Sequence, residues 1–156
     1  VEFNKSYTRE FLKKYGVTRI SINPQTFCQA TLKRIGRQVS TTQVLQAYSM
    51  ALEKGFVVNM DMIAGLPQEK FATFKKSMAT LLELYPHNIT IHTLSLKRAA
   101  DLKWQQELVS DKDVEKMVDY SYKLLSENGY KPYYLYRQKN QLKGIAHVVY
   151  FRDEHV

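Results

Sequence analysis

The chain has 156 residues, of which 44% are hydrophobic and 24% are charged, and its net charge is +8. This length suits one compact unit, so we expect residues 1–156 to form a single domain. No apolar stretch approaches the roughly 20 residues that a transmembrane helix needs, and no run of five or more like charges occurs. These totals argue against a membrane protein and make nucleic acid an unlikely partner. The positive charge indicates either a solvated basic surface or an attraction for an acidic small molecule.

Cys28 is the one cysteine in the sequence. It cannot form an internal disulfide or hold an iron–sulfur cluster on its own, which indicates a reducing, cytoplasmic location. We expect it to be buried as a small hydrophobic residue. The sequence begins with Val1 rather than with methionine, so the chain is either processed or part of a longer protein.

Hydrophobic periodicity and capping residues predict an alternation of helices and strands. In chain order we expect a helix over 8–15, a strand over 17–23, a helical turn over 31–36, a helix from about 41 to 54, a strand over 57–63, a helix over 69–84, a strand over 88–94, a helix over 111–128 and strands over 133–137 and 145–151. This order predicts an α/β fold of parallel βα repeats, with the first four strands parallel and joined by right-handed crossovers. Their largely apolar residues predict strands that are covered on both faces.

Four parallel strands cannot close a barrel, because a complete eight-stranded barrel usually needs about 200 residues or more. The chain therefore forms either an open sheet or part of a barrel. In both cases the strands at the edges are left unpaired, which predicts self-association through those edges.

Two segments at the ends of predicted strands carry the candidate site. The first reads R-I-S-I-N-P-Q and ends at Gln25, and the second reads N-M-D-M-I-A-G-L-P and contains Asp61. Strand ends in βαβ units share one edge, so Gln25, Arg37 and Asp61 are expected to meet around one small molecule. The alternatives are a turn residue at Gln25, a surface ion pair at Arg37 and an Asp61 that satisfies loop N–H groups. Gly65 would let the backbone approach the ligand.

Three further features bear on the ligand. His92 is predicted to be a satisfied interior histidine rather than a base, and the pair Lys97 and Arg98 could hold an anion at the same edge. Tyr136 and Arg137, in the run Y-Y-L-Y-R-Q-K-N, suit a flat ring with acidic substituents. The same run would suit single-stranded nucleic acid, or its tyrosines could be core residues. No compact basic stripe supports nucleic acid.

Five strings in this order resemble the radical S-adenosylmethionine enzymes, and more narrowly the oxygen-independent coproporphyrinogen III oxidase family in its coproporphyrinogen dehydrogenase-like branch. They are R-I-S-I-N-P-Q-T at 19–26, I-G-R at 35–37, N-M-D-M-I-A-G-L-P at 59–67, H-T-L-S-L-K-R at 92–98 and Y-Y-L-Y-R-Q-K-N at 133–140. The resemblance covers roughly residues 8–145. It implies a partial (β/α)₆ TIM-like barrel, of which this chain is similar to the second half.

The resemblance also implies ligands and a reaction. Gln25, Arg37 and Asp61 match positions that contact S-adenosylmethionine, and Ile63 matches a position near its adenine. The family reaction converts two propionates of coproporphyrinogen III to vinyl groups in heme biosynthesis, starting from a 5′-deoxyadenosyl radical. A tetrapyrrole of this kind would suit a basic substrate surface made by Lys97, Arg98, Tyr136 and Arg137.

The chain departs from the family pattern at several points. The motif C-x₃-C-x₂-C, which holds the family's 4Fe–4S cluster, is absent, and so is the glycine-rich segment that binds the methionine moiety. Gln68 stands where the family usually has glycine, and A-H-V-V-Y at 146–150 replaces an E-N-V-G-Y-like sequence. We therefore expect this chain to be inactive on its own. The alternatives are a non-catalytic half-barrel that binds a tetrapyrrole or another anion, and a heme chaperone-like module.

Overall fold

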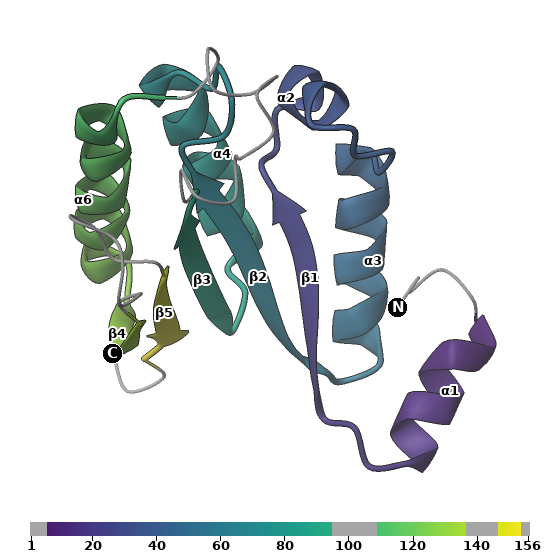
Figure 1. Cartoon of the computed structure of the whole chain (residues 1–156). Coiled ribbons are helices and arrows are strands. Elements are labelled where there is room, and N and C mark those ends of the chain that lie inside the picture. The colour runs from purple at the N-terminus through teal and green to yellow at the C-terminus, as the bar shows by residue number, and fades with distance from the viewer. Residues whose placement is uncertain (1–5, 95–108, 137–146, 154–156) are drawn as a thin grey trace.

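A computed structural model describes residues 6–94, 109–136 and 147–153 of the chain (Figure 1). The helices are α1 (Ser6–Lys14), α2 (Gln29–Arg34), α3 (Thr41–Glu53), α4 (Phe71–Leu84) and α6 (Asp111–Glu127). The strands are β1 (Arg19–Gln25), β2 (Val57–Ala64), β3 (Asn88–Thr93), β4 (Tyr130–Tyr136) and β5 (His147–Arg152). No helix in these ranges is both long and apolar enough to cross a membrane.

The strands form one five-stranded sheet in the order β1-β2-β3-β5-β4. β1, β2 and β3 are parallel neighbours, as the sequence predicts, whereas β5 is antiparallel to both β3 and β4. β4 therefore runs in the same direction as β1, β2 and β3, as predicted, although its neighbour in the sheet is β5 rather than β3. Residues 137–146 are too few for the crossover that parallel neighbours need, so β5 returns antiparallel beside β4 and occupies the place next to β3.

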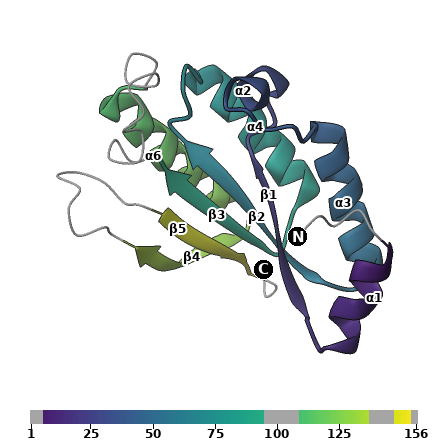
Figure 2. The same cartoon turned by 45° about the vertical axis from the view of Figure 1, so that its right-hand side comes forward.

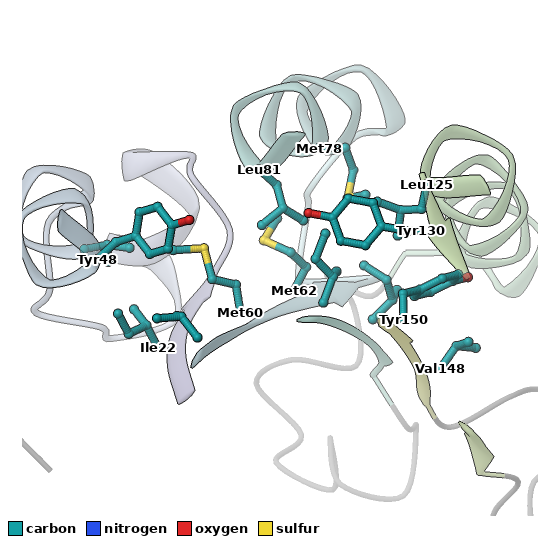
Figure 3. Close-up of a cluster of buried hydrophobic side chains, with 14 of the residues drawn as sticks. Ile22, Tyr48, Met60, Met62, Met78, Leu81, Leu125, Tyr130, Val148 and Tyr150 are labelled. Atoms are coloured by element: carbon teal, nitrogen blue, oxygen red, sulfur yellow. The ribbon is translucent and has the colours of Figure 1, made fainter. Parts of the chain in front are cut away.

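Helices α3, α4 and α6 all lie against the same face of the sheet (Figures 1 and 2). The hydrophobic core fills the layer between them, where Met60 and Met62 of β2 meet Met78 and Leu81 of α4 (Figure 3). Tyr130 lies in the same layer, and its hydroxyl donates a hydrogen bond of 2.6 Å to the carbonyl oxygen of Pro86. Burial raises the pKa of Tyr130 because the charged form would lose its hydration.

Local capping sets the ends of two helices close to their predicted positions. Ser40 and Gln43 form a reciprocal capping box at the start of α3. Ser110 caps α6 by accepting from the backbone N–H of Asp113, and its hydroxyl donates to the Asp113 carboxylate. The residue types that favour N-caps therefore placed both starts correctly.

The buried stripe of α3 leaves out two of its large apolar residues. Val44, Tyr48 and Ala51 are buried, whereas Leu45 and Leu52 are 38% and 43% exposed. Ala47 is buried in their place. The face of α3 that packs on β1 and β2 is therefore narrower than hydrophobic residue type suggests.

Candidate functional site

One face of the sheet is lined by polar side chains, and we call it the open face because no described helix packs on it (Figure 2). Along β2, buried residues alternate with half-buried ones. The half-buried set contains Asn59, Asp61 and Ile63, while the alternate residues enter the core. β2 is therefore apolar on the face that the helices cover and mostly polar on the other, whereas residues 88–91 of β3 are buried on both faces.

A network of hydrogen bonds crosses the open face from β1 to β3. The side-chain amide of Asn59 donates to Ser21 Oγ at 3.2 Å and to Asp61 Oδ1 at 2.6 Å. Thr90 donates its hydroxyl to Asn59 Oδ1 at 3.0 Å. Asp61 is thus held by side chains, and it lies within β2 rather than at the end of that strand.

His92 continues the network toward β5. Its Nε2 lies 3.4 Å from Asp61 Oδ2, and its ring centroid is 5.4 Å from that of His147, the residue opposite it on β5. Burial, together with the nearby His92, lowers the pKa of His147. His92 was expected in the interior, but its side chain is 38% exposed. The structure places it on the open face beside Asp61 instead.

Gln25 and Arg37 lie together at the C-terminal end of β1. Gln25 is the last residue of that strand, pairs with Met62 of β2 and has a left-handed φ of 63°, which is uncommon outside glycine. Arg37 Nη2 donates to the backbone oxygen of Asn23 at 2.9 Å. Arg37 Nε is buried and has no hydrogen-bond partner among the described residues. Since Asp61 immediately precedes Met62, the fold brings Gln25, Arg37 and Asp61 to one region.

A buried polar cluster fixes the loop that follows Gln25. Thr26 donates to Glu69 Oε2 at 2.7 Å, and its hydroxyl is 3.2 Å from Ser77 Oγ. The backbone N–H of Phe27 donates to the same Ser77 oxygen at 3.1 Å. Burial raises the pKa of Glu69, while the hydrogen bond from Thr26 and the charge of Arg34 oppose that rise. The cluster ties the β1–α2 loop to α4 and so holds Gln25 in its unusual conformation.

Gly65 has a packing role at the end of β2. Its φ is +92°, and a Cβ atom there would lie 2.7 Å from Val114 Cγ2 of α6. The glycine therefore permits a close approach between the end of β2 and a helix. Its predicted role in admitting a ligand stays a prediction.

Of the remaining predicted residues, Tyr136 and Cys28 belong to the part of the chain that the structure describes. Lys97, Arg98 and Arg137 lie outside the described residues. Tyr136 ends β4 opposite His147, and its side chain is not described. Cys28 is only partly buried, contrary to expectation, and a hydrogen bond with the Thr31 side chain lowers the pKa of its thiol.

The sequence analysis missed Asn59, Thr90 and Glu69. Asn59 could have been found, because N-M-D-M alternates polar and apolar residues with the period of a half-buried strand. Thr90 follows from the same alternation in N-I-T-I-H. Glu69 carried no such signal, because its burial depends on contacts with residues far away in the sequence.

Comparison with known proteins identifies the family. The model of the radical SAM superfamily matches residues 7–81. Over 143 residues the chain is 39% identical to the oxygen-independent coproporphyrinogen-III oxidase-like protein HemZ of Bacillus subtilis, which covers 89% of this chain and 28% of that protein. It is also 30% identical over 123 residues to the heme chaperone HemW of Lactococcus lactis. That match covers 75% of this chain and 32% of HemW. The chain thus spans less than a third of the length of these relatives.

Solved structures agree with this assignment at the level of fold. Coproporphyrinogen III oxidase (HemN) from Escherichia coli, described as a radical SAM enzyme, matches with a TM-score of 0.76 at 23% identity, over 99% of this chain and 34% of that one. This likeness confirms the predicted partial TIM-like barrel, in which the described sheet is part of the wall. The chain belongs to the radical SAM superfamily, among the relatives of oxygen-independent coproporphyrinogen III oxidase.

The family implies two cofactors, and the described residues fit them differently. Arg37 offers a buried, unpaired donor, and Asp61 uses one contact on each oxygen, which leaves its carboxylate further accepting capacity. These groups suit the carboxylate and hydroxyls of S-adenosylmethionine. A 4Fe–4S cluster does not fit, because the sequence has one cysteine and the described residues hold no group of three or more metal-binding side chains.

Proposed function

We propose that this chain supplies the S-adenosylmethionine-binding part of a radical SAM protein that acts on an acidic tetrapyrrole. The observation that supports it most is the pairing of Gln25 with Met62, the residue that follows Asp61 in β2. Arg37 is tied to β1 by its hydrogen bond to the Asn23 backbone, and Ile63 shares the face of Asp61. When bound, S-adenosylmethionine supplies the radical chemistry that begins reactions of this superfamily. The ligands of the iron–sulfur cluster that such chemistry requires would come from outside these 156 residues.

Each residue has a part that its chemistry suits. The Arg37 guanidinium would pair with the methionine carboxylate, because its planar fork matches that group. Asp61 would accept hydrogen bonds from the ribose hydroxyls, and Ile63 would pack against the adenine ring. Gln25 has both a donor and an acceptor at the end of β1, where it can complete the polar contacts.

The test is titration calorimetry of this chain with S-adenosylmethionine. Arg37→Ala removes a charge-assisted hydrogen bond worth about 1.5–3 kcal/mol, so the Kd should rise by about 10- to 100-fold. Arg19→Ala is the matched control, because Arg19 is exposed at the start of β1, at the opposite end of that strand from Gln25. Equal affinity of wild type and Arg37→Ala would contradict the proposal.

For the substrate, we propose the oxidative decarboxylation of coproporphyrinogen III propionates by the protein to which this chain contributes, with Lys97, Arg98, Tyr136 and Arg137 as contacts. This follows from the similarity to HemZ, which is named as oxidase-like. Stronger binding of coproporphyrin III than of hemin would favour it. A basic patch of this kind would make that binding weaken as salt is added.

The second candidate is the binding of heme without catalysis. The similarity to heme chaperones named HemW favours it. Preference for hemin over coproporphyrin III, seen as a shift of the hemin absorption band, would support this candidate and would contradict the oxidase proposal.

A further inference from the structure

We propose that Asn59 positions the Asp61 carboxylate for its ligand, and that the buried hydroxyl of Thr90 anchors the Asn59 amide. This inference rests on the proposed role of Asp61 in binding S-adenosylmethionine. Three hydrogen bonds join the residues across β1, β2 and β3: Thr90 to Asn59, Asn59 to Asp61 and Asn59 to Ser21.

The chemistry of the groups fixes the direction of the chain of hydrogen bonds. An ionised carboxylate only accepts, so the NH₂ side of the Asn59 amide must face Asp61 Oδ1, 2.6 Å away. The carbonyl side of the amide then faces Thr90, whose hydroxyl must donate. Thr90 is 7% exposed, so water does not readily replace it. The carboxylate therefore sets the amide orientation, and the Thr90 hydroxyl anchors the amide in it.

Loss of the Thr90 hydrogen bond would loosen the site. The Asn59 amide would be held through its NH₂ group alone, and its side chain would be free to swing away from Asp61. Asp61 would then be held from one side only, by His92 at 3.4 Å. A carboxylate that turns toward His92 presents different lone pairs to the ribose hydroxyls. The affinity for S-adenosylmethionine should therefore fall, even without a contact between the ligand and Asn59 or Thr90.

Thr90→Val tests this directly, since valine has nearly the same shape and lacks the hydroxyl. We expect S-adenosylmethionine to bind about 5- to 10-fold more weakly, corresponding to one lost hydrogen bond, and Thr90→Ser to restore the affinity. Thr80→Val is the matched control, because the Thr80 hydroxyl donates to the backbone oxygen of Lys76 in its own helix, away from the open face. It should leave the affinity unchanged.

A double-mutant cycle separates positioning from a general structural effect. If Thr90 acts through Asp61, adding Thr90→Val to Asp61→Asn should weaken binding little further. An equal loss in both backgrounds, or wild-type affinity in Thr90→Val, would overturn the inference.

The side-chain amide resonances of Asn59 give a readout that needs no ligand. In wild type its two N–H protons should exchange slowly and be well separated, and in Thr90→Val they should move toward the values of an exposed amide. If wild-type chain binds no S-adenosylmethionine, the proposed function fails for this chain, and these resonances alone decide the positioning inference. Resonances that do not respond to Thr90→Val would then reject it.

Discussion

Replacing Gly65 by alanine should destabilise the fold through two separable effects. The φ of +92° is unfavourable for any residue with a Cβ atom, at a cost of roughly 1–2 kcal/mol. The new methyl group would also lie 2.7 Å from Val114 Cγ2, well inside the contact distance of carbon atoms. Overpacking of this kind costs about 1–3 kcal/mol, so the total is about 2–5 kcal/mol. Against a usual stability of about 5–15 kcal/mol, that loss is easily measured.

Equilibrium unfolding in urea resolves the two effects with three companion variants. Gly36 has a similar φ of +75° and no neighbour within 4 Å of its virtual Cβ, so Gly36→Ala should show the backbone cost alone. Val114→Ala should lose about 1 kcal/mol of packing, because its side chain is half-buried. Combined with Gly65→Ala it should relieve the clash, giving a favourable coupling of about 1–3 kcal/mol.

Two results would refute this reasoning. If Gly65→Ala and Gly36→Ala lose the same stability, α6 moves aside at no cost and the close approach does not constrain the sequence. If the Gly65→Ala and Val114→Ala losses simply add, the two side chains do not meet in solution.

Two further predictions concern buried polar groups. Burial raises the pKa of Glu69 above its ordinary 4.5, so the folded state holds the carboxyl proton more tightly than the unfolded chain does. The contribution of Glu69 to stability therefore falls as pH rises through the raised pKa. Glu69→Gln should remove that decline, seen by comparing free energies of unfolding at about pH 5 and about pH 8; parallel pH profiles would mean that the carboxyl group is hydrated. Tyr130→Phe should cost about 1–2 kcal/mol, because the Pro86 carbonyl loses its 2.6 Å donor, and an unchanged denaturation midpoint would show that water replaces the hydroxyl.

The sequence predicted the elements better than their neighbours in the sheet. The strands over 57–63 and 88–94 and the helix over 111–128 end within one residue of β2, β3 and α6. Their signals are local: apolar runs, capping residues and glycines after helix ends. The place of β5 between β3 and β4 depends on which edges meet in space, and residue spacing alone did not reveal it.

The grouping of the candidate site residues follows from the strand order, and their contacts with a ligand stay a prediction. Parallel strands end at one edge of a sheet, so residues near the ends of β1 and β2 lie in one region whatever their side chains do. Asp61 has Asn59 and His92 as partners. Both follow from the alternation of polar and apolar residues along β2 and β3. Glu69 could not be inferred, because a surface glutamate and a buried one look alike in sequence until Thr26 and Ser77 are placed beside it.

The alternation along β2 also constrains how this segment can change during evolution. Odd-numbered positions from Asn59 to Ile63 face the open side, and even-numbered positions from Met60 to Ala64 enter the core. Removing or adding one residue upstream in the strand would exchange the two sets, driving the Asp61 carboxylate into the methionine-rich interior and exposing the methionines. Lineages of this protein can therefore diversify β2 by substitution, whereas a single-codon insertion or deletion within it would damage stability and ligand binding at the same time.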